Sequence, residues 1–210
     1  MLLAIDTSAG TSVALVDRDR GVIAELGTTD TMRHAEVIGR LIAECLDQGA
    51  VAVSDLSGVA AGMGPGPFTG LRVGIAAARV FALGAGKPVV PVVSHDALAH
   101  DFYSSGATSE LLVVTDARRR EVYWSAYAGL DDAGLPVRTD GPGLAKPDSL
   151  LLADFPHRHL ERLNASAISA GALGMVAELT FAAGRPAAND EPLYLRSPDV
   201  TLSPGPKRVS

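Results

Sequence analysis

The amino-acid sequence predicts an α/β fold, because short apolar runs typical of strands alternate with longer segments of helical period. The first sign is three aliphatic runs at residues 2–6, 11–17 and 21–28, which are separated by turn residues. The second is the glycine-rich block GMGPGPFTGLRVG, Gly62–Gly74, which leads directly into an alanine-rich segment. A chain of 210 residues has room for one domain or for two small lobes.

The three opening runs are predicted to form an antiparallel meander. After Thr31 the apolar residues follow the period of a helix, and Gly49 stands where its C-terminal cap belongs. The apolar residues of this helix are Ala35, Ile38, Leu41, Ile42, Cys45 and Leu46. A buried strand is predicted to follow over residues 57–63.

A second helix is predicted from about Thr69 to Leu83, with Thr69 as its N-cap and Gly84 and Gly86 at its end. Four elements are predicted further on, namely strands at 88–93 and 111–117, a helix at 94–102 and the return arm of a hairpin at 121–128.

The pattern weakens after Leu130. Residues 131–148 have the composition of a loop, and residues 150–163 are ambiguous. An apolar helix is predicted over 170–184, and residues 201–210 are expected to form a flexible tail.

The composition argues against several classes of protein. The chain has 18 basic and 24 acidic residues and a formal net charge of −6, so we expect no large nucleic-acid footprint on this chain alone. The opening MLLAID has no basic flank and soon meets Asp6, so it is expected to be neither a signal peptide nor a membrane span. The single cysteine, Cys45, cannot form an internal disulfide, which fits a reducing cytoplasm.

The glycine-rich block admits two interpretations, a phosphate-binding loop or a turn that aims the following helix. It carries neither a G-x-G-x-x-G fingerprint nor a Gly-Lys-Ser/Thr ending, and its two prolines remove backbone donors, so the turn is favoured. Gly70, Gly74 and Ala78 recur every four residues and leave one helix face nearly smooth. The sequence leaves open whether that face packs within the chain or against another chain.

Asp6 ends the first predicted strand, and Thr7 and Ser8 follow it. A carboxylate there could hold a metal-bound water while the hydroxyls face a phosphate, but a simple turn explains the same residues at least as well. No nucleophile elbow of the G-x-S-x-G type occurs. The histidines do not predict a metal site, since His95 and His100 are five residues apart and the pair His157 and His159 is typical of a solvated surface.

Arg118, Arg119 and Arg120 are consecutive and lie at the predicted hairpin turn. A solvated turn is the simpler interpretation. The alternative is a small cationic contact for a phosphate or an acidic partner.

Five motifs resemble the TsaB (YeaZ) family, whose members are accessory subunits in the bacterial synthesis of threonylcarbamoyladenosine on tRNA. Four of them, in chain order, are LLAIDTS with the following TSVAL, RHAEVIGRLI, GPGPFTGLRVG and DARRREVYW. The fifth, EPLYLRSPD at Glu191–Asp199, is similar to the C-terminal end of the family. Pro67 and Ala35 depart from the residues common in the family, which are serine and a polar residue.

The resemblance implies an actin-like ASKHA (ribonuclease H-like) fold with a reduced second lobe. Residues 1–103 would form the N-terminal lobe with the partner-binding helices, and residues 104–200 the smaller C-terminal lobe. It also implies a non-catalytic cytoplasmic subunit that dimerises with TsaD and works with the ATPase TsaE and, indirectly, with tRNA. We expect no cofactor of its own, no metal and no membrane contact, with ATP and Mg²⁺ entering only through the complex.

The expected contact with TsaD is a bundle of the two predicted helices of each partner, and a homodimer through the same helices is possible in its absence. The residues assigned to it are Ala35, Ile38, Ile42, Cys45, Gly70, Val73, Gly74, Ala77 and Ala78. On this interpretation Gly74→Glu would abolish association and leave the monomer folded. The alternatives are a small kinase or ATPase of the same superfold and, last, a glycopeptidase-like hydrolase.

Overall fold

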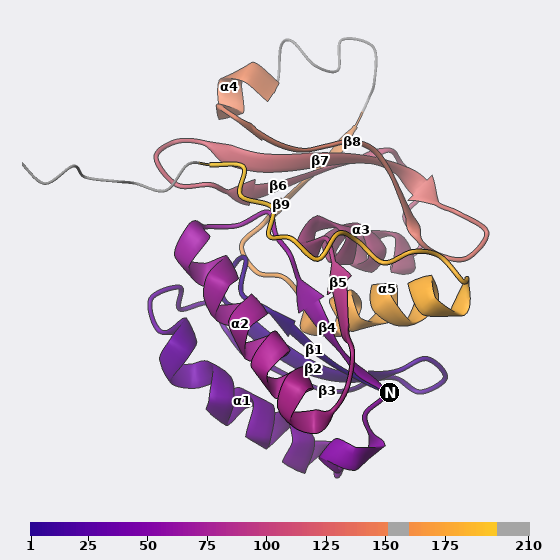
Figure 1. Ribbon diagram of the computed structural model, residues 1–210. Coiled ribbons are helices and arrows are strands. Elements are labelled where there is room, and N and C mark those ends of the chain that lie inside the picture. Colours follow the sequence, from indigo (N-terminus) through magenta and orange to yellow (C-terminus); the bar gives the residue numbers. More distant parts are fainter. Residues whose placement is uncertain (151–159, 197–210) are drawn as a thin grey trace, which may run out of the picture.

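The computed structural model describes residues 1–150 and 160–196, which form two β-sheets with helices between and outside them (Figure 1). The first sheet has the strand order β3-β2-β1-β4-β5. Its strands are β1 Leu2–Asp6, β2 Thr11–Asp17, β3 Gly21–Thr28, β4 Gly58–Gly62 and β5 Val89–Val92. The first three are the predicted antiparallel meander, and β4 and β5 continue the sheet in parallel with β1.

The second sheet repeats part of this topology. Its order is β8-β7-β6-β9, with antiparallel β6, β7 and β8 and with β9 parallel to β6. Its strands are β6 Leu111–Asp116, β7 Val122–Leu130, β8 Pro136–Ala145 and β9 Glu161–Ala165. The order matches β3-β2-β1-β4 of the first sheet, and no counterpart of β5 occurs in the described part of the chain.

The helices form layers around the two sheets. Helices α1 (His34–Gln48) and α2 (Phe68–Ala85) lie side by side on the outer face of the first sheet (Figure 1). Helices α3 (Ser94–Ser104) and α5 (Ala170–Ala182) lie between the sheets, and the single turn α4 (Pro147–Leu150) lies beyond the second sheet. A 3₁₀ turn, η1 (Val53–Asp55), precedes β4.

The first sheet is covered on both faces because its side chains alternate between two cores. Leu3 and Ile5 of β1 pack toward α1 and α2, whereas Leu2 and Ala4 pack toward α3 and α5. Every residue of β1 and β4 is buried. This double burial explains why both strands read as continuous apolar runs.

The predicted loop over residues 131–148 is wrong, since β8 occupies most of it and α4 its end. β8 pairs with β7 alone in the described structure, and its register shifts repeatedly. An edge strand tolerates proline and glycine, so Pro136, Gly141 and Pro142 are compatible with a strand here. A composition rich in proline and glycine therefore does not distinguish a loop from an edge strand.

The predicted N-cap at Thr69 is also wrong. Helix α2 begins at Phe68, and its N-cap is Pro67, which makes no side-chain capping bond. The ambiguous region at 150–163 includes the start of β9. Its residues 151–159, with His157 and His159, and the predicted tail at 201–210 lie outside the described residues.

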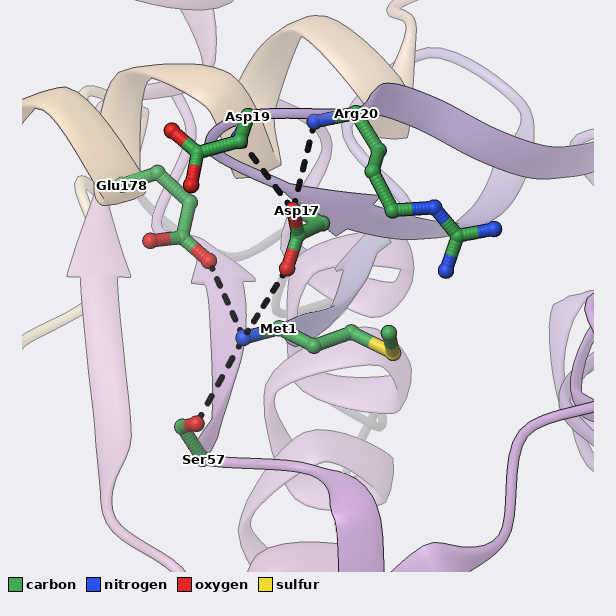
Figure 2. A network of polar contacts seen from close by, with 6 residues as sticks. All are labelled: Met1, Asp17, Asp19, Arg20, Ser57 and Glu178. Carbon is green, nitrogen blue, oxygen red and sulfur yellow. Dashed lines mark hydrogen bonds and ion pairs between the residues drawn. The ribbon is translucent and has the colours of Figure 1, made fainter.

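A polar network ties α5 to the first sheet near the chain start (Figure 2). The Met1 amino group lies 3.4 Å from Glu178 Oε1 and 3.9 Å from Asp17 Oδ2, and it donates to Ser57 Oγ at 3.4 Å. Asp17 Oδ1 in turn accepts the backbone N–H groups of Asp19 and Arg20. The end of β2, α5 and the entry to β4 thus meet at one point.

The final described segment, residues 186–196, returns along the molecule from α5 toward the second sheet (Figure 1). The Leu193 N–H donates to the Met63 carbonyl at 2.8 Å, and Arg79 Nη2 donates to Asp190 Oδ1 at 2.8 Å. The Tyr194 ring lies 4.8 Å from that of Phe68 at the start of α2. The EPLYLR motif is therefore packed against the first lobe.

Candidate functional site

Asp6 ends β1, and its carboxylate is held in a buried hydrogen-bond network. Ser94 Oγ donates to Oδ2 at 2.5 Å, and Ser8 donates its N–H to Oδ1 at 2.8 Å and its hydroxyl to Oδ2 at 3.2 Å. The Gly64 N–H donates to Ser94 Oγ at 3.0 Å. Burial raises the pKa of Asp6, while the hydrogen bonds from Ser94 and Ser8 lower it. The network joins β1, the loop before α2 and the start of α3.

Thr7 explains the small residues of α2. Its hydroxyl donates to the Gly70 carbonyl at 2.7 Å. A Cβ at Gly74 would lie 2.1 Å from Thr7 Oγ1, and one at Gly70 would lie 2.7 Å from the Thr7 carbonyl oxygen. The smooth face therefore packs within the chain at these positions. Gly74→Glu would not leave the monomer intact, which corrects the expectation attached to that variant.

The residues predicted for the partner surface divide into two groups. Ala35 is exposed, and Val73 and Ala77 are partly exposed. The others are buried against the chain's own core: Ile38, Ile42, Cys45, Gly70, Gly74 and Ala78. Burial also raises the pKa of the Cys45 thiol to about 11, so this cysteine is held as an unreactive core residue. The helical period was read correctly, but most residues chosen from it lie on the inner face.

The outer face of α2 carries a second apolar stripe. Val80 and Leu83 are 70% and 83% exposed. The stripe consists of Thr69, Val73, Ala76, Val80 and Leu83, spaced alternately four and three residues apart. Residues at this spacing form the contact line when one helix packs along another. The signal was present in the sequence, since α2 is apolar on nearly all sides.

On α1, the exposed residues Ala35, Gly39 and Ala43 recur every four positions. Small side chains at this spacing permit close approach of another helix. Met32, just before α1, is 81% exposed. Together α1 and α2 expose apolar residues along α2 and small residues along α1, the latter beside the exposed Arg40–Glu44 ion pair.

The three arginines occupy the β6–β7 turn as predicted. Arg118, Arg119 and Arg120 all have positive φ angles, of 61°, 53° and 62°. Arg118 Nη2 donates to Thr31 Oγ1 at 2.7 Å, which connects the hairpin to the segment before α1. Arg118 and Arg119 line a cavity of about 640 Å³, to which Ser8 also contributes.

His95 is fully buried between α3 and the second sheet. Its Nδ1 lies 2.8 Å from Ser125 Oγ and its Nε2 lies 2.9 Å from Thr115 Oγ1. Burial, aided by the nearby charge of Arg138, lowers the pKa of His95 to about 3, so the ring is neutral. Among the described residues no group of three or more His, Cys, Asp and Glu side chains is placed to hold a metal ion.

Helix α2 is, in the part of the chain that the structure describes, the one helix long and apolar enough to cross a membrane by length and composition. About a third of it is buried inside the protein, against the first sheet. Its apolarity follows from having both an inner face and the outer stripe.

Comparison with known proteins agrees with this architecture. Residues 12–175 match the family described as TsaD: tRNA N6-adenosine threonylcarbamoyltransferase. An uncharacterized protein of Mycobacterium tuberculosis is 38% identical over 211 residues, covering 95% of this chain and 93% of the relative. The Escherichia coli tRNA threonylcarbamoyladenosine biosynthesis protein TsaB is 28% identical over 170 residues, covering 81% of this chain and 70% of that protein.

Among solved structures, a Pseudomonas aeruginosa protein described as similar to the peptidase YeaZ superposes with a TM-score of 0.78 and 27% identity. The superposition covers 93% of this chain and 99% of that one, so the two share nearly the whole architecture. The predicted fold class is confirmed by this likeness. The chain belongs to the TsaD family, and the resemblance to its TsaB (YeaZ) members that the motifs predicted is confirmed.

Proposed function

We propose that this chain is a non-catalytic subunit that dimerises with TsaD and supports threonylcarbamoyl transfer to the tRNA adenosine beside the anticodon. The observation that carries the proposal is the exposed stripe on α2. Val80 and Leu83 have no cover in the described structure, and their spacing with Ala76 and Val73 fits the seam of a helix pair.

The choice of TsaD as partner rests on the likeness between the two chains. The family match over residues 12–175 includes both α1 and α2. A protein of the same family offers equivalent helices, and two such helix pairs can meet about a pseudo-twofold axis. The E. coli relative is named as a tRNA threonylcarbamoyladenosine biosynthesis protein, which supports a role for this chain in the synthesis of the same modification.

The non-catalytic role is supported by the state of Asp6. Its two carboxylate oxygens accept hydrogen bonds from Ser94 and Ser8, and Oδ2 lies so close to Gly62 at the end of β4 that a Cβ there would be 1.9 Å away. A kinase or ATPase would need a carboxylate there that is free to hold a hydrated cation. We therefore infer that TsaE and TsaD supply the ATP-dependent and transfer chemistry in the cytoplasm, and that tRNA contacts this chain only within the complex.

The test is reconstitution of tRNA threonylcarbamoylation from TsaD, TsaE and the adenylate-forming enzyme, with this chain omitted, added, or added as Val80→Glu. A carboxylate in the apolar seam is expected to abolish association and reduce modification to the level without the chain. The matched control is Phe181→Glu on α5, where another strongly exposed apolar residue, at 81% against 70% for Val80, lies outside the stripe.

Modification that proceeds equally well without this chain would refute the proposed function. If the Val80→Glu variant still associates with TsaD, the contact with TsaD lies elsewhere on the surface. Mg-ATP turnover by the isolated, purified chain, lost in Asp6→Asn, would instead favour the kinase or ATPase alternative.

A further inference from the structure

A second, smaller cavity of about 200 Å³ lies beside β5, the edge strand of the first sheet (Figure 1). Its walls come from β5, α5, the start of α3, β8 and residues 186–188. The last of these segments is tied to β5 by the Ala188 N–H, which donates to the Pro91 carbonyl at 3.3 Å. None of its described lining residues belongs to α1 or α2, so the smaller cavity is separate from the surface proposed for TsaD.

The volume limits the size of a ligand. About 200 Å³ equals the share of about seven water molecules in the liquid, and it is below the roughly 300–1,000 Å³ of pockets that hold drug-sized molecules. The smaller cavity therefore suits a molecule of about seven or eight non-hydrogen atoms.

Most of the wall is apolar. Valine, proline and alanine side chains from β5, α5 and residues 186–188 supply it. Thr180 has the one side-chain hydroxyl among the described lining residues, and it donates to the Val176 carbonyl at 2.7 Å. Such a wall suits an aliphatic group, and Asp96 and Arg138 are the side chains left to hold a polar one.

Asp96 and Arg138 form an ion pair with long contacts. Arg138 Nε lies 3.3 Å from Asp96 Oδ1, and Arg138 Nη2 lies 3.4 Å from Oδ2. Close contacts between such charged groups are about 2.7–2.9 Å. The Tyr127 hydroxyl donates to Asp96 Oδ1 at 2.7 Å and so fixes the carboxylate from the second sheet.

Both members of the pair keep capacity for a ligand. Among the described residues, Asp96 Oδ2 has only the long contact with Arg138. The contacts with Asp96 engage Nε and Nη2 of Arg138, and a guanidinium has five N–H donors. The Asp96 and Arg138 side chains are 18% and 26% exposed, so they are largely removed from water and still reachable.

The pair also selects the charge of the ligand. Asp96 and Arg138 compensate each other, so a ligand with a net charge would bring an unmatched charge into an apolar cavity, which is costly. A zwitterion adds one charge of each sign. Its ammonium can approach Asp96 Oδ2 and its carboxylate the remaining donors of Arg138, without separating the pair.

We propose that the smaller cavity binds a small α-amino acid with an uncharged aliphatic side chain. The ammonium contacts Asp96, the carboxylate contacts Arg138, and the side chain packs against the apolar wall. The proposal does not depend on the contact with TsaD, and it stands or falls separately from the reconstitution experiment.

The test is calorimetric titration of the full chain with L-valine and with two analogues that each lack one charge. L-valine is expected to bind with a Kd below about 1 mM. Valinamide lacks the carboxylate and 3-methylbutanoate lacks the ammonium. Each analogue should bind at least about tenfold more weakly, because it loses charge-assisted hydrogen bonds on one side.

Arg138→Lys tests the position of the ligand. Lysine keeps the positive charge beside Asp96, so the fold is retained, but it lacks the planar fork that matches a carboxylate. The variant is expected to bind L-valine about tenfold more weakly. The matched control is Arg185→Lys, since Arg185 also pairs with an aspartate, Asp131, but does not line the smaller cavity. This change should alter the affinity less than about twofold.

The titrations of the wild type decide the proposal without any variant. Absence of L-valine binding at millimolar concentration would overturn it. Equal affinity for L-valine and 3-methylbutanoate would show a simple anion site, and equal affinity for L-valine and valinamide would show that no carboxylate is held. Either result would refute the proposal, as would equal losses from Arg138→Lys and Arg185→Lys in variants whose circular dichroism matches the wild type.

Discussion

The two sheets share a strand order but differ in how they are covered. The first has helices on both faces, and all of β1 and β4 is buried. The second packs against α3 and α5 on one face, while its other face has a small cluster that includes Leu112, Val114 and Leu150. In β8 no residue is fully buried. The same strand order thus forms a sheet buried on both faces in the first lobe and a more exposed sheet in the second.

The difference indicates where each lobe can take a function. A sheet enclosed on both faces allows its outer helices α1 and α2 to present a second face to a partner. The second lobe contributes Arg118 and Arg119 of its hairpin turn to the lining of the larger cavity, of about 640 Å³. The following predictions test this division, beginning with the largest effect.

Gly74→Glu is expected to destabilise the fold by more than about 4 kcal/mol, because it places a charge where even a Cβ would overlap Thr7. Urea unfolding and the yield of soluble protein measure the loss. Val80→Glu on the exposed side of the same helix should change stability by less than about 0.5 kcal/mol. Similar losses in the two variants would contradict the assignment of inner and outer faces.

Truncating one leucine in each sheet compares the lobes directly. Leu3→Ala in fully buried β1 should cost about 3 kcal/mol, whereas Leu163→Ala in partly exposed β9 should cost about 1.5 kcal/mol. Chemical denaturation of both variants provides the comparison. Equal costs would show that the second lobe is packed as tightly as the first.

The contact between α3 and the second sheet should weaken in mild acid. The pKa of His95 is about 3 in the folded protein and near 6.5 when unfolded, so the unfolded state binds the extra proton between these values. The His95 contribution is complete above pH 6.5 and should fall by about 1.5 kcal/mol between pH 6.5 and pH 5. Burial raises the pKa of Asp6 and Asp96, and these carboxyls act in the opposite direction.

Unfolding of the wild type and of His95→Gln across that pH range isolates the His95 term. The difference in stability between the two proteins should shrink as the pH falls. A constant difference would show that His95 is not buried as a neutral ring.

The smallest expected effect concerns the hairpin turn. Arg120 has a φ of 62°, a conformation that glycine adopts more easily, so Arg120→Gly should stabilise the fold by about 0.5 kcal/mol. Ala50→Gly, with a φ of 50° after α1, should give a gain of the same size in the first lobe. Thermal melting of both variants would detect it, and a loss at either position would indicate that the side chain makes a compensating contact.

The sequence by itself determined the elements of the first lobe. Alternating aliphatic runs predicted β1 to β3, and the helical period with Gly49 at its end predicted α1, because local propensity and burial agree there. It also predicted the arginine turn between β6 and β7 and the family. The sequence did not show that the second sheet repeats the strand order of the first. Strands pair through backbone groups, so two sheets can share an order without sharing a pattern of side chains.

Only the tertiary structure decided which face of each helix is free. Ile38, Cys45 and Gly74 have the correct period but face the core, whereas Val80 and Leu83 face outward. The sequence of an apolar helix does not indicate which side packs on its own sheet, because both sides carry apolar side chains. The larger cavity likewise depends on long-range placement. Arg118 and Thr31 are 87 residues apart and share a hydrogen bond only because the chain brings the two lobes together.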